Sequence, residues 1–175
     1  MKKGTGIMWY VVQCVEGKEE QMITSLKRNL PDLCTDVFLF RYERMKKYGG
    51  EWHVSNEILF PGYVFMESKD AEELYKRLKQ YPGIIRVLGE ENAMIAVYAE
   101  EEAFLRKLCS RQYSVSMSKG YIKSGVTYVT EGPLAGYEKN IKKIDRHKRM
   151  AILRISLGKQ EVDVKVGLEI VKKIA

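Results

Sequence analysis

The sequence predicts an α+β protein in which a ferredoxin-like layer of antiparallel strands and helices is followed by a small all-β barrel. Two observations lead to this prediction. Over residues 8–111, the apolar periodicities of strands and helices alternate in the order β-α-β-β-α-β-α, which is typical of a ferredoxin-like fold. From residue 125 onward, five short strand patterns follow one another within about 50 residues, as they do in small barrels.

The elements of the first part follow from periodicity and from the residues that start or stop them. Apolar side chains three or four positions apart predict a helix between Gly17 and Pro31 and a second helix after Asp70, its expected N-cap. Gly49-Gly50 predicts the turn of a hairpin. The expected strands are 8–14, 36–44, 59–67, 84–88 and 94–98, and a third helix with an acidic first turn is expected over 100–111.

The strand at 59–67 is the most apolar short run of the first half of the chain. Pro61-Gly62 predicts a bend or bulge where this strand enters its sheet, because proline lacks a backbone donor and glycine tolerates unusual dihedral angles. Beyond the bend, Tyr63 and Phe65 lie on one face of the strand, since side chains alternate. Composition favours a central strand with both faces buried; the alternative presents the aromatic rings to a partner.

The second part begins after a change in composition. Residues 113–124 are rich in serine and lack a clear period, so they predict a linker. This gives an N-terminal domain over 1–112 and a C-terminal domain over 125–175. The expected barrel strands are 127–130, 140–145, 150–156, 160–165 and 170–172, with a tight turn at 157–159.

The net charge of +7 is uneven along the chain. Residues 1–110 carry 16 basic and 17 acidic side chains, whereas residues 120–175 carry 12 basic and 6 acidic ones. Such asymmetry indicates a polyanionic partner for the last third, and nucleic acid is the commonest polyanion. The alternative is a basic surface that is merely solvated.

Several function classes find no support in the sequence. Cys14, Cys34 and Cys109 are too far apart for a zinc site and fit reduced thiols of a cytoplasmic protein. No apolar run is long enough for a membrane helix, and no secretion signal is recognisable. His53 and His147 have no catalytic partners in sequence, and the acidic run 100–102 suits a helix start. We therefore expect neither an enzyme nor a bound cofactor or metal.

A dense basic run is the main candidate for nucleic-acid binding. Ile141 and Ile144 are its expected inward positions, and their odd spacing predicts an irregular strand. The remaining side chains would face solvent around a β-turn and contact phosphates, and Arg146 and Arg149 could also contact guanine edges. The candidate residues are Lys139, Lys142, Lys143, Arg146, His147, Lys148 and Arg149.

Three short motifs resemble one known family. The segments 9–13 (WYVVQ) and 60–64 (FPGYV) are similar to the N-terminal domain of the NusG family of transcription elongation factors. Gly132-Pro133 is similar to the start of that family's C-terminal KOW motif. The motifs occur in the family's order and at its spacing, so the resemblance covers nearly the whole chain. It implies a ferredoxin-like NGN domain followed by a KOW barrel.

The resemblance also implies partners. In the family, aromatic side chains of the N-terminal domain contact the clamp helices, a coiled-coil tip of the largest RNA polymerase subunit, as anchors in a helix–groove contact. The matching residues are Trp9, Phe60, Tyr63 and Phe65, of which we expect Trp9 to lie in the core and Tyr63 and Phe65 to make contacts. The basic, aromatic hairpin at 45–54 would lie near upstream DNA, and the factor would act as a monomer.

The basic run departs from the usual family pattern. Ordinary members carry a glycine and then acidic residues after the Gly-Pro pair, where this chain has Lys139 and Lys142-Lys143. Among specialised paralogues the chain most resembles the LoaP group of processive antiterminators, whose recruitment involves an RNA hairpin in the nascent transcript. Three alternatives stay open: a general NusG factor that binds Rho or a ribosomal protein, an RfaH-like factor recruited by non-template DNA, and a ribosome-associated KOW protein.

Overall fold

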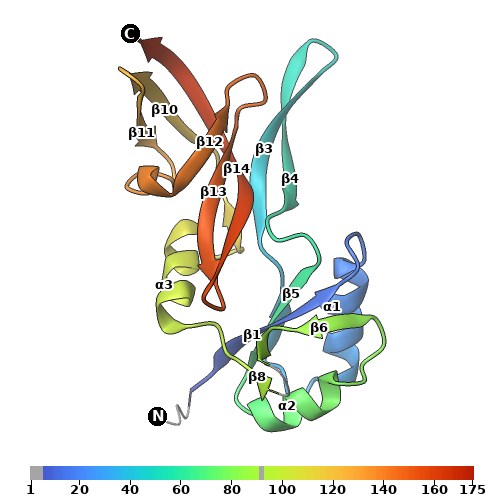
Figure 1. Ribbon diagram of the computed structural model, residues 1–175. Coiled ribbons are helices and arrows are strands. Elements are labelled where there is room, and N and C mark those ends of the chain that lie inside the picture. Colours follow the sequence, from blue (N-terminus) through green and yellow to red (C-terminus); the bar gives the residue numbers. More distant parts are fainter. Residues whose placement is uncertain (1–5, 91–92) are drawn as a thin grey trace. The chain divides into compact units, whose positions relative to one another are not determined.

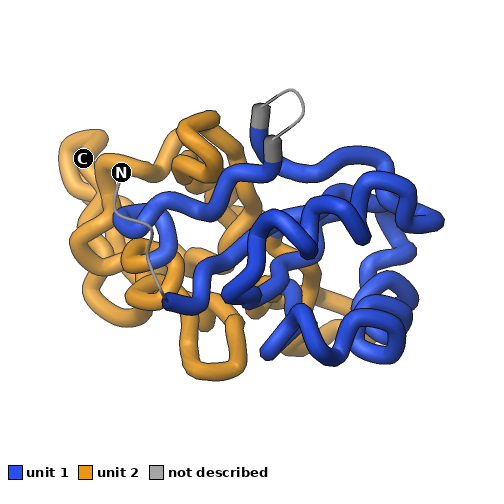
Figure 2. The backbone as a smooth tube through the Cα atoms, turned by 90° about the horizontal axis from the view of Figure 1, so that it is seen from below, with its two compact units in different colours: residues 1–39, 60–102 blue, residues 40–59, 103–175 orange. Residues whose placement is uncertain are grey.

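The computed structural model describes residues 6–90 and 93–175; the start of the chain, where a secretion signal was considered, lies outside them. The chain divides into two compact units (Figure 2). Unit 1 comprises residues 1–39 and 60–102, and unit 2 comprises residues 40–59 and 103–175. The segment 40–59 therefore groups with the C-terminal residues. The predicted domain boundaries at 112 and 125 divide the chain differently, and they stay a prediction.

Unit 1 is built on a four-stranded sheet in the order β2-β5-β1-β6, of which β5, β1 and β6 are labelled in Figure 1. All three strand pairs are antiparallel. The α+β class predicted from the alternating periodicities is confirmed. The elements are β1 (Met8–Cys14), α1 (Glu19–Asn29), β2 (Asp36–Phe38), β5 (Tyr63–Ser68), α2 (Ala71–Leu78), β6 (Ile84–Val87), β7 (Gly89–Glu90), β8 (Ala93–Met94) and α3 (Ala99–Leu108), the last of which ends in unit 2.

The two central strands of this sheet are buried on both faces. Val64, Phe65 and Met66 are consecutive in β5, and none has exposed surface. Tyr10 and Val11 are likewise neighbours in β1 and are both buried. Continuous burial requires continuous apolar residues, and the sequence supplies them in both strands. The prediction from composition, a central strand without a free face, was right for β5.

Helix starts in unit 1 follow their sequence patterns. The backbone N–H of Glu73 donates to the Asp70 side chain at 3.1 Å, so the predicted N-cap of α2 is confirmed. In α3, the buried Glu101 carboxylate accepts a hydrogen bond from the backbone N–H of Tyr98 at 3.1 Å. The acidic run at 100–102 thus serves a helix start.

The Pro61-Gly62 bend is a tight turn. The backbone N–H of Tyr63 donates to the carbonyl of Phe60 at 3.0 Å, and Gly62 has a φ of +84°. Proline at the second position and a positive-φ glycine at the third are typical of a type II turn. A Cβ on Gly62 would lie 2.9 Å from the carbonyl oxygen of Cys14, so only glycine fits. The predicted bend at the entry of β5 is confirmed.

Unit 2 contains a long hairpin and a five-stranded sheet in the order β11-β10-β14-β13-β12. Strand β14 pairs with β13 up to Gly167 and with β10 from Leu168 onward, so one strand serves both halves of the sheet. Figure 1 shows its length. The elements are β3 (Arg41–Tyr48), β4 (Glu51–Ile58), β9 (Ser114–Val115), β10 (Ser118–Lys123), β11 (Val126–Glu131), the 3-10 helix η1 (Glu138–Asn140), β12 (Ile141–Asp145), β13 (Met150–Leu157) and β14 (Gln160–Ile174).

Four expectations about strands need correction. The strand expected over 94–98 is limited to β8 (Ala93–Met94), since residues 95–98 form no strand. The single strand expected over 36–44 is two strands, because β2 pairs with β5 while β3 leaves to pair with β4. The segment 113–124, expected to be a linker without regular structure, contains β9 and β10, and β10 pairs with both β11 and β14. The strands expected at 160–165 and 170–172 are one strand, β14.

Candidate functional site

The four aromatic residues with a proposed polymerase contact are mostly buried. Trp9, Phe60 and Phe65 are at most 2% exposed, and only Tyr63 retains surface. Phe65 lies among other rings, with centroids 5.6 Å from Phe60 and 5.8 Å from Phe38. Trp9 also donates its indole N–H to Glu67 at 3.0 Å. The expectation that Trp9 is core agrees with its burial, whereas the contact expected for Phe65 conflicts with its place inside this cluster.

The basic run forms strand β12 and the turn that follows it. Ile141 pairs with Leu153 and Lys143 with Ile152, so Lys142 is an extra residue in the strand. Such a bulge breaks the alternation of faces. As a result, Lys142 and Lys143 are both exposed, while Ile141 and Ile144 are half-buried. The irregularity predicted from the spacing of the two isoleucines is confirmed.

The β12–β13 turn projects three further basic residues. The backbone N–H of Lys148 donates to the Asp145 carboxylate at 3.0 Å, and the backbone N–H of Arg149 donates to the Arg146 carbonyl at 3.3 Å. Arg149 has a φ of +52°, which closes a four-residue loop. The side chains of Arg146, His147 and Lys148 are exposed.

A surface groove lies beside β12. Its volume is about 470 Å³, and its charged lining consists of Lys139, Lys142 and Lys143 together with one acidic residue, Glu138. Half-buried Ile141 and Ile144 contribute an apolar lining. Lys139 stands where the usual family pattern has a glycine. It lies in the 3-10 helix η1 and has no positive φ, so the backbone does not require glycine at this position. The groove thus combines cations with apolar surface, as nucleic-acid sites often do.

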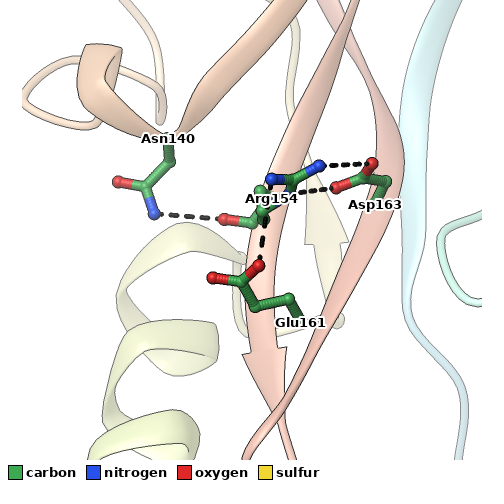
Figure 3. A network of polar contacts seen from close by, with 4 residues as sticks. All are labelled: Asn140, Arg154, Glu161 and Asp163. Carbon is green, nitrogen blue, oxygen red and sulfur yellow. Dashed lines mark hydrogen bonds and ion pairs between the residues drawn. The ribbon is translucent and has the colours of Figure 1, made fainter.

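The cations of this surface differ in how they are neutralised. Lys143, Arg146 and Lys148 form no ion pair with any residue that the structure describes. Arg154 on β13, in contrast, makes two hydrogen bonds to Asp163 at 2.8 and 3.2 Å and lies 3.8 Å from Glu161 (Figure 3). The Arg154 guanidinium lowers the pKa of the Asp163 carboxyl. Arg154 therefore ties β13 to β14, and its charge is already compensated.

Arg149 also differs from its neighbours in the run. Its guanidinium carbon lies 3.9 Å from the ring centroid of Trp52, and its Nη1 lies 3.7 Å from a Glu169 oxygen. This is a cation–π contact combined with an ion pair. Since both contacts engage the guanidinium, Arg149 is half-buried whereas Lys148 is exposed. The guanine contact considered for Arg149 stays a prediction. Trp52 was not predicted as its partner.

The hairpin carries a charged cluster on its β3–β4 face. The Tyr42 hydroxyl donates to Glu57 at 3.0 Å, Lys46 Nζ contacts the same carboxylate, and Arg44 Nη1 lies 3.6 Å from it. Burial raises the pKa of Tyr42, so its hydroxyl stays protonated and can donate. Nearer the tip, the rings of Tyr48 and His53 stack with centroids 3.7 Å apart.

The Glu57 cluster predicts a loss of stability in acid. Its hydrogen bond with Lys46 lowers the pKa of Glu57 below the ordinary value of 4.5. A lowered folded-state pKa gives a stabilisation that is complete above pH 4.5 and is lost as pH falls through the lower value. We expect the stability difference between the chain and its Glu57→Gln variant, measured by urea unfolding, to shrink between pH 6 and pH 3. A difference that stays constant over this range would contradict the assignment.

The described residues do not hold a metal-ion cluster, and burial suppresses the reactivity of two cysteine thiols. No three His, Cys, Asp or Glu side chains within residues 6–90 and 93–175 are grouped as a metal ion would require. Burial raises the pKa of Cys34 to about 11 and that of Cys109 to about 12, so neither thiol forms a reactive thiolate at neutral pH. No helix in this part of the chain has the length and apolar character to cross a membrane.

Comparison with known protein families shows which family the chain belongs to. The model of the family described as "Transcription termination factor nusG" matches residues 8–106, which is more than half of the chain. The chain belongs to the NusG family. This family consists of non-enzymatic transcription factors, and membership confirms the prediction that the chain is not an enzyme.

Curated NusG proteins align over almost the full chain. The transcription termination/antitermination protein NusG of Haemophilus influenzae is 24% identical over 173 residues, covering 95% of this chain and 94% of that protein. NusG of Halalkalibacterium halodurans is 25% identical over 176 residues, covering 95% and 98%. A solved structure titled "Domain interaction in Thermotoga maritima NusG" matches with a TM-score of 0.52 at 18% identity, covering 94% of this chain and 96% of that one. The fold therefore matches that of NusG over 94% of the chain.

Proposed function

We propose that the chain is a specialised NusG-type antiterminator, most similar to the LoaP group, that binds a structured RNA hairpin in the nascent transcript. The observation that carries this proposal is the set of uncompensated cations on β12 and its turn. Lys143, Arg146 and Lys148 are exposed and lack an ion pair within the described residues. Cations that are neither packed nor paired are suited to phosphate contacts.

The groove beside β12 supports RNA as the ligand. Lys139, Lys142 and Lys143 line it together with apolar surface. Basic side chains can follow a phosphate backbone while apolar side chains contact sugars or an unstacked base. RNA hairpins offer both features, because their loops and bulges expose bases beside a double-stranded stem.

The second part of the proposed function is docking on RNA polymerase. Tyr63 is the one residue of the aromatic set 9, 60, 63 and 65 that is not buried, so it is the proposed contact with the clamp helices of the largest subunit. Trp9, Phe60 and Phe65 would then support the shape of that surface from beneath. In this proposal the factor works as a cytoplasmic monomer without a membrane or cofactor, and the 45–54 hairpin lies near upstream DNA.

The test measures RNA binding by the full chain. Binding to an RNA hairpin, a single-stranded scramble and duplex DNA is followed across a salt series. About three to five phosphate contacts predict a log–log salt slope on the order of −3 to −4 for the hairpin. We expect the Lys142→Ala, Lys143→Ala, Arg146→Ala variant to lose roughly a hundredfold in affinity, because three charge-assisted contacts disappear together.

A charge-matched control separates specific contacts from net charge. The Lys123→Ala, Lys172→Ala, Lys173→Ala variant removes three exposed cations near the C-terminal ends of strands β10 and β14 in the same sheet. It should retain most of the hairpin affinity. Equal losses in both variants, or equal affinity for all three nucleic acids, would contradict hairpin recognition and favour a general NusG factor. Preference for duplex or non-template DNA would favour the RfaH-like alternative, in which the Tyr48–His53 stack at the hairpin tip is a candidate contact.

A further inference from the structure

A second, smaller pocket lies in unit 2 and shares Lys143 with the groove beside β12. It has a volume of about 190 Å³ and opens between residues of the β3–β4 hairpin and of strands β12 to β14. Four cations line it, and one carboxylate accompanies them. The charged lining residues are Arg44, Lys143, Lys148, Lys165 and Asp145.

Strand register explains why two of these lysines share the pocket. Ile152 on β13 pairs with Lys143 on β12 and with Lys165 on β14. Directly paired residues point to the same face of a sheet, so Lys143 and Lys165 flank Ile152 about 10 Å apart. They can approach one small anion from opposite sides. The two lysines are 22 positions apart in the chain, so sequence alone does not join them.

Arg44 brings an unused donor to the same pocket. Its Nε is buried and has no hydrogen-bond partner among the described residues. Its Nη1 already faces Glu57 at 3.6 Å, which leaves the Nε–Nη2 edge of the guanidinium for another acceptor. This edge is the fork that binds phosphate through two parallel hydrogen bonds. A buried donor without a partner is unfavourable, and an incoming oxyanion would satisfy it.

The carboxylate does not cancel this charge. The Asp145 side chain accepts the backbone N–H of Lys148 at 3.0 Å and thereby shapes the turn. Four cations against one anion leave a formal excess of three positive charges around the pocket. Like charges this close repel one another unless an anion lies between them. A water molecule occupies about 30 Å³, so the volume accommodates a phosphate group with part of its hydration.

We propose that this pocket binds a phosphate group, held by the Nε–Nη2 edge of Arg44 and by Lys143, Lys148 and Lys165. The phosphate can belong to the backbone of the bound RNA, which rests on the proposed function, or it can be a free phosphate ion, which does not. Since Arg44 Nε is covered, the guanidinium must turn slightly before it reaches the ligand, and its long 3.6 Å pair with Glu57 permits this.

The test uses the full chain and follows the Arg44 Nε–H resonance by NMR, assigned by its loss in Arg44→Lys. One arm adds sodium phosphate against sodium chloride at equal ionic strength, and the other adds the RNA hairpin. In the RNA arm, Arg44→Met and Lys165→Ala should each weaken binding roughly five- to tenfold and reduce the magnitude of the salt slope by about 1. Lys172→Ala, an exposed lysine on β14 outside the pocket, is the matched control and should bind as the unchanged chain does.

The outcomes distinguish RNA-backbone phosphate from a free phosphate ion, and they test the phosphate pocket separately from the proposed RNA binding. A resonance shift with phosphate that Lys165→Ala weakens, without any RNA binding, supports a free phosphate ligand and overturns the proposed RNA function alone. RNA binding that is lost in the 142/143/146 variant but unchanged in Arg44→Met and Lys165→Ala, with no phosphate-dependent shift, overturns the pocket and leaves the RNA function intact. Lys165 is exposed, so its variant is informative even if Arg44→Met fails to fold.

Discussion

Replacement of Phe65 by alanine is expected to lower the free energy of unfolding by about 3–5 kcal/mol. Phe65 has no exposed surface and lies in the middle of β5, between β2 and β1. Its ring contacts those of Phe38, Phe60 and Trp9 at centroid distances of 5.8, 5.6 and 6.5 Å. The cost combines lost apolar burial with a cavity that rigid neighbouring rings cannot fill.

Tyr63→Ala is the matched control for Phe65→Ala. Tyr63 is an aromatic residue on the same face of the same strand, but it is partly exposed. Urea unfolding should show a loss for Tyr63→Ala of less than about half that for Phe65→Ala, because less surface is uncovered. Polymerase capture by folded protein should show the reverse order, with Tyr63→Ala the weaker binder. A stable Phe65→Ala variant that fails to capture polymerase would restore Phe65 as a direct contact.

The contrast between Tyr63 and Phe65 shows what sequence patterns can establish in the N-terminal part. The apolar run at 59–67, the bend at Pro61-Gly62 and the cap at Asp70 depend on neighbours in sequence, and the structure contains all three. Which face of β5 is covered depends on β2 and on rings such as Phe38, far away in sequence. Alternation places Tyr63 and Phe65 on one face, but it does not say how much of that face is open.

The C-terminal part shows the same limit. The basic run and its strand irregularity were predictable, because the spacing of Ile141 and Ile144 is a local property. The pairing of β10 with β14 was not, since parallel pairing joins residues some 50 positions apart and the serine-rich segment has little strand propensity. For the same reason, Trp52 beside Arg149 and Arg44 beside Lys165 could not be identified as neighbours. Pairing between strands that are distant in sequence therefore determines which basic side chains find an acidic or aromatic partner and which do not.

Glu19→Ala is expected to cost about 2–3 kcal/mol of stability, although it removes a buried charge. The Glu19 side chain is 3% exposed, and no basic residue among those described forms an ion pair with it. Its Oε1 accepts the buried backbone N–H of Gly62 at 2.9 Å, and both oxygens accept the N–H of Gly17 at 3.0–3.1 Å. Each charge-assisted hydrogen bond contributes about 1.5–3 kcal/mol.

Two opposing effects decide the sign of this prediction. Burial of a carboxylate without a cation is costly, so its removal could in principle be neutral. Against this, the carboxylate lies in the first turn of α1, where the helix dipole favours an anion, and Lys18 at the N-cap gives no side-chain cap. Alanine would also leave the buried N–H of Gly62 without its acceptor.

Glu19→Gln separates charge from hydrogen bonding in this prediction. Glutamine retains one side-chain oxygen for Gly62, while the exposed N–H of Gly17 can turn to water. We expect a loss of about 1 kcal/mol for Glu19→Gln and a clearly larger one for Glu19→Ala, both from urea unfolding with unchanged m-values. Equal stability of Glu19→Ala and the unchanged chain would mean that desolvation cancels the hydrogen bonds. The Phe60–Tyr63 turn, which presents Tyr63, would then be held without a net contribution from Glu19. It would rest on Pro61, Gly62 and the hydrogen bond that the Cys14 N–H donates to the Gly62 carbonyl at 2.7 Å.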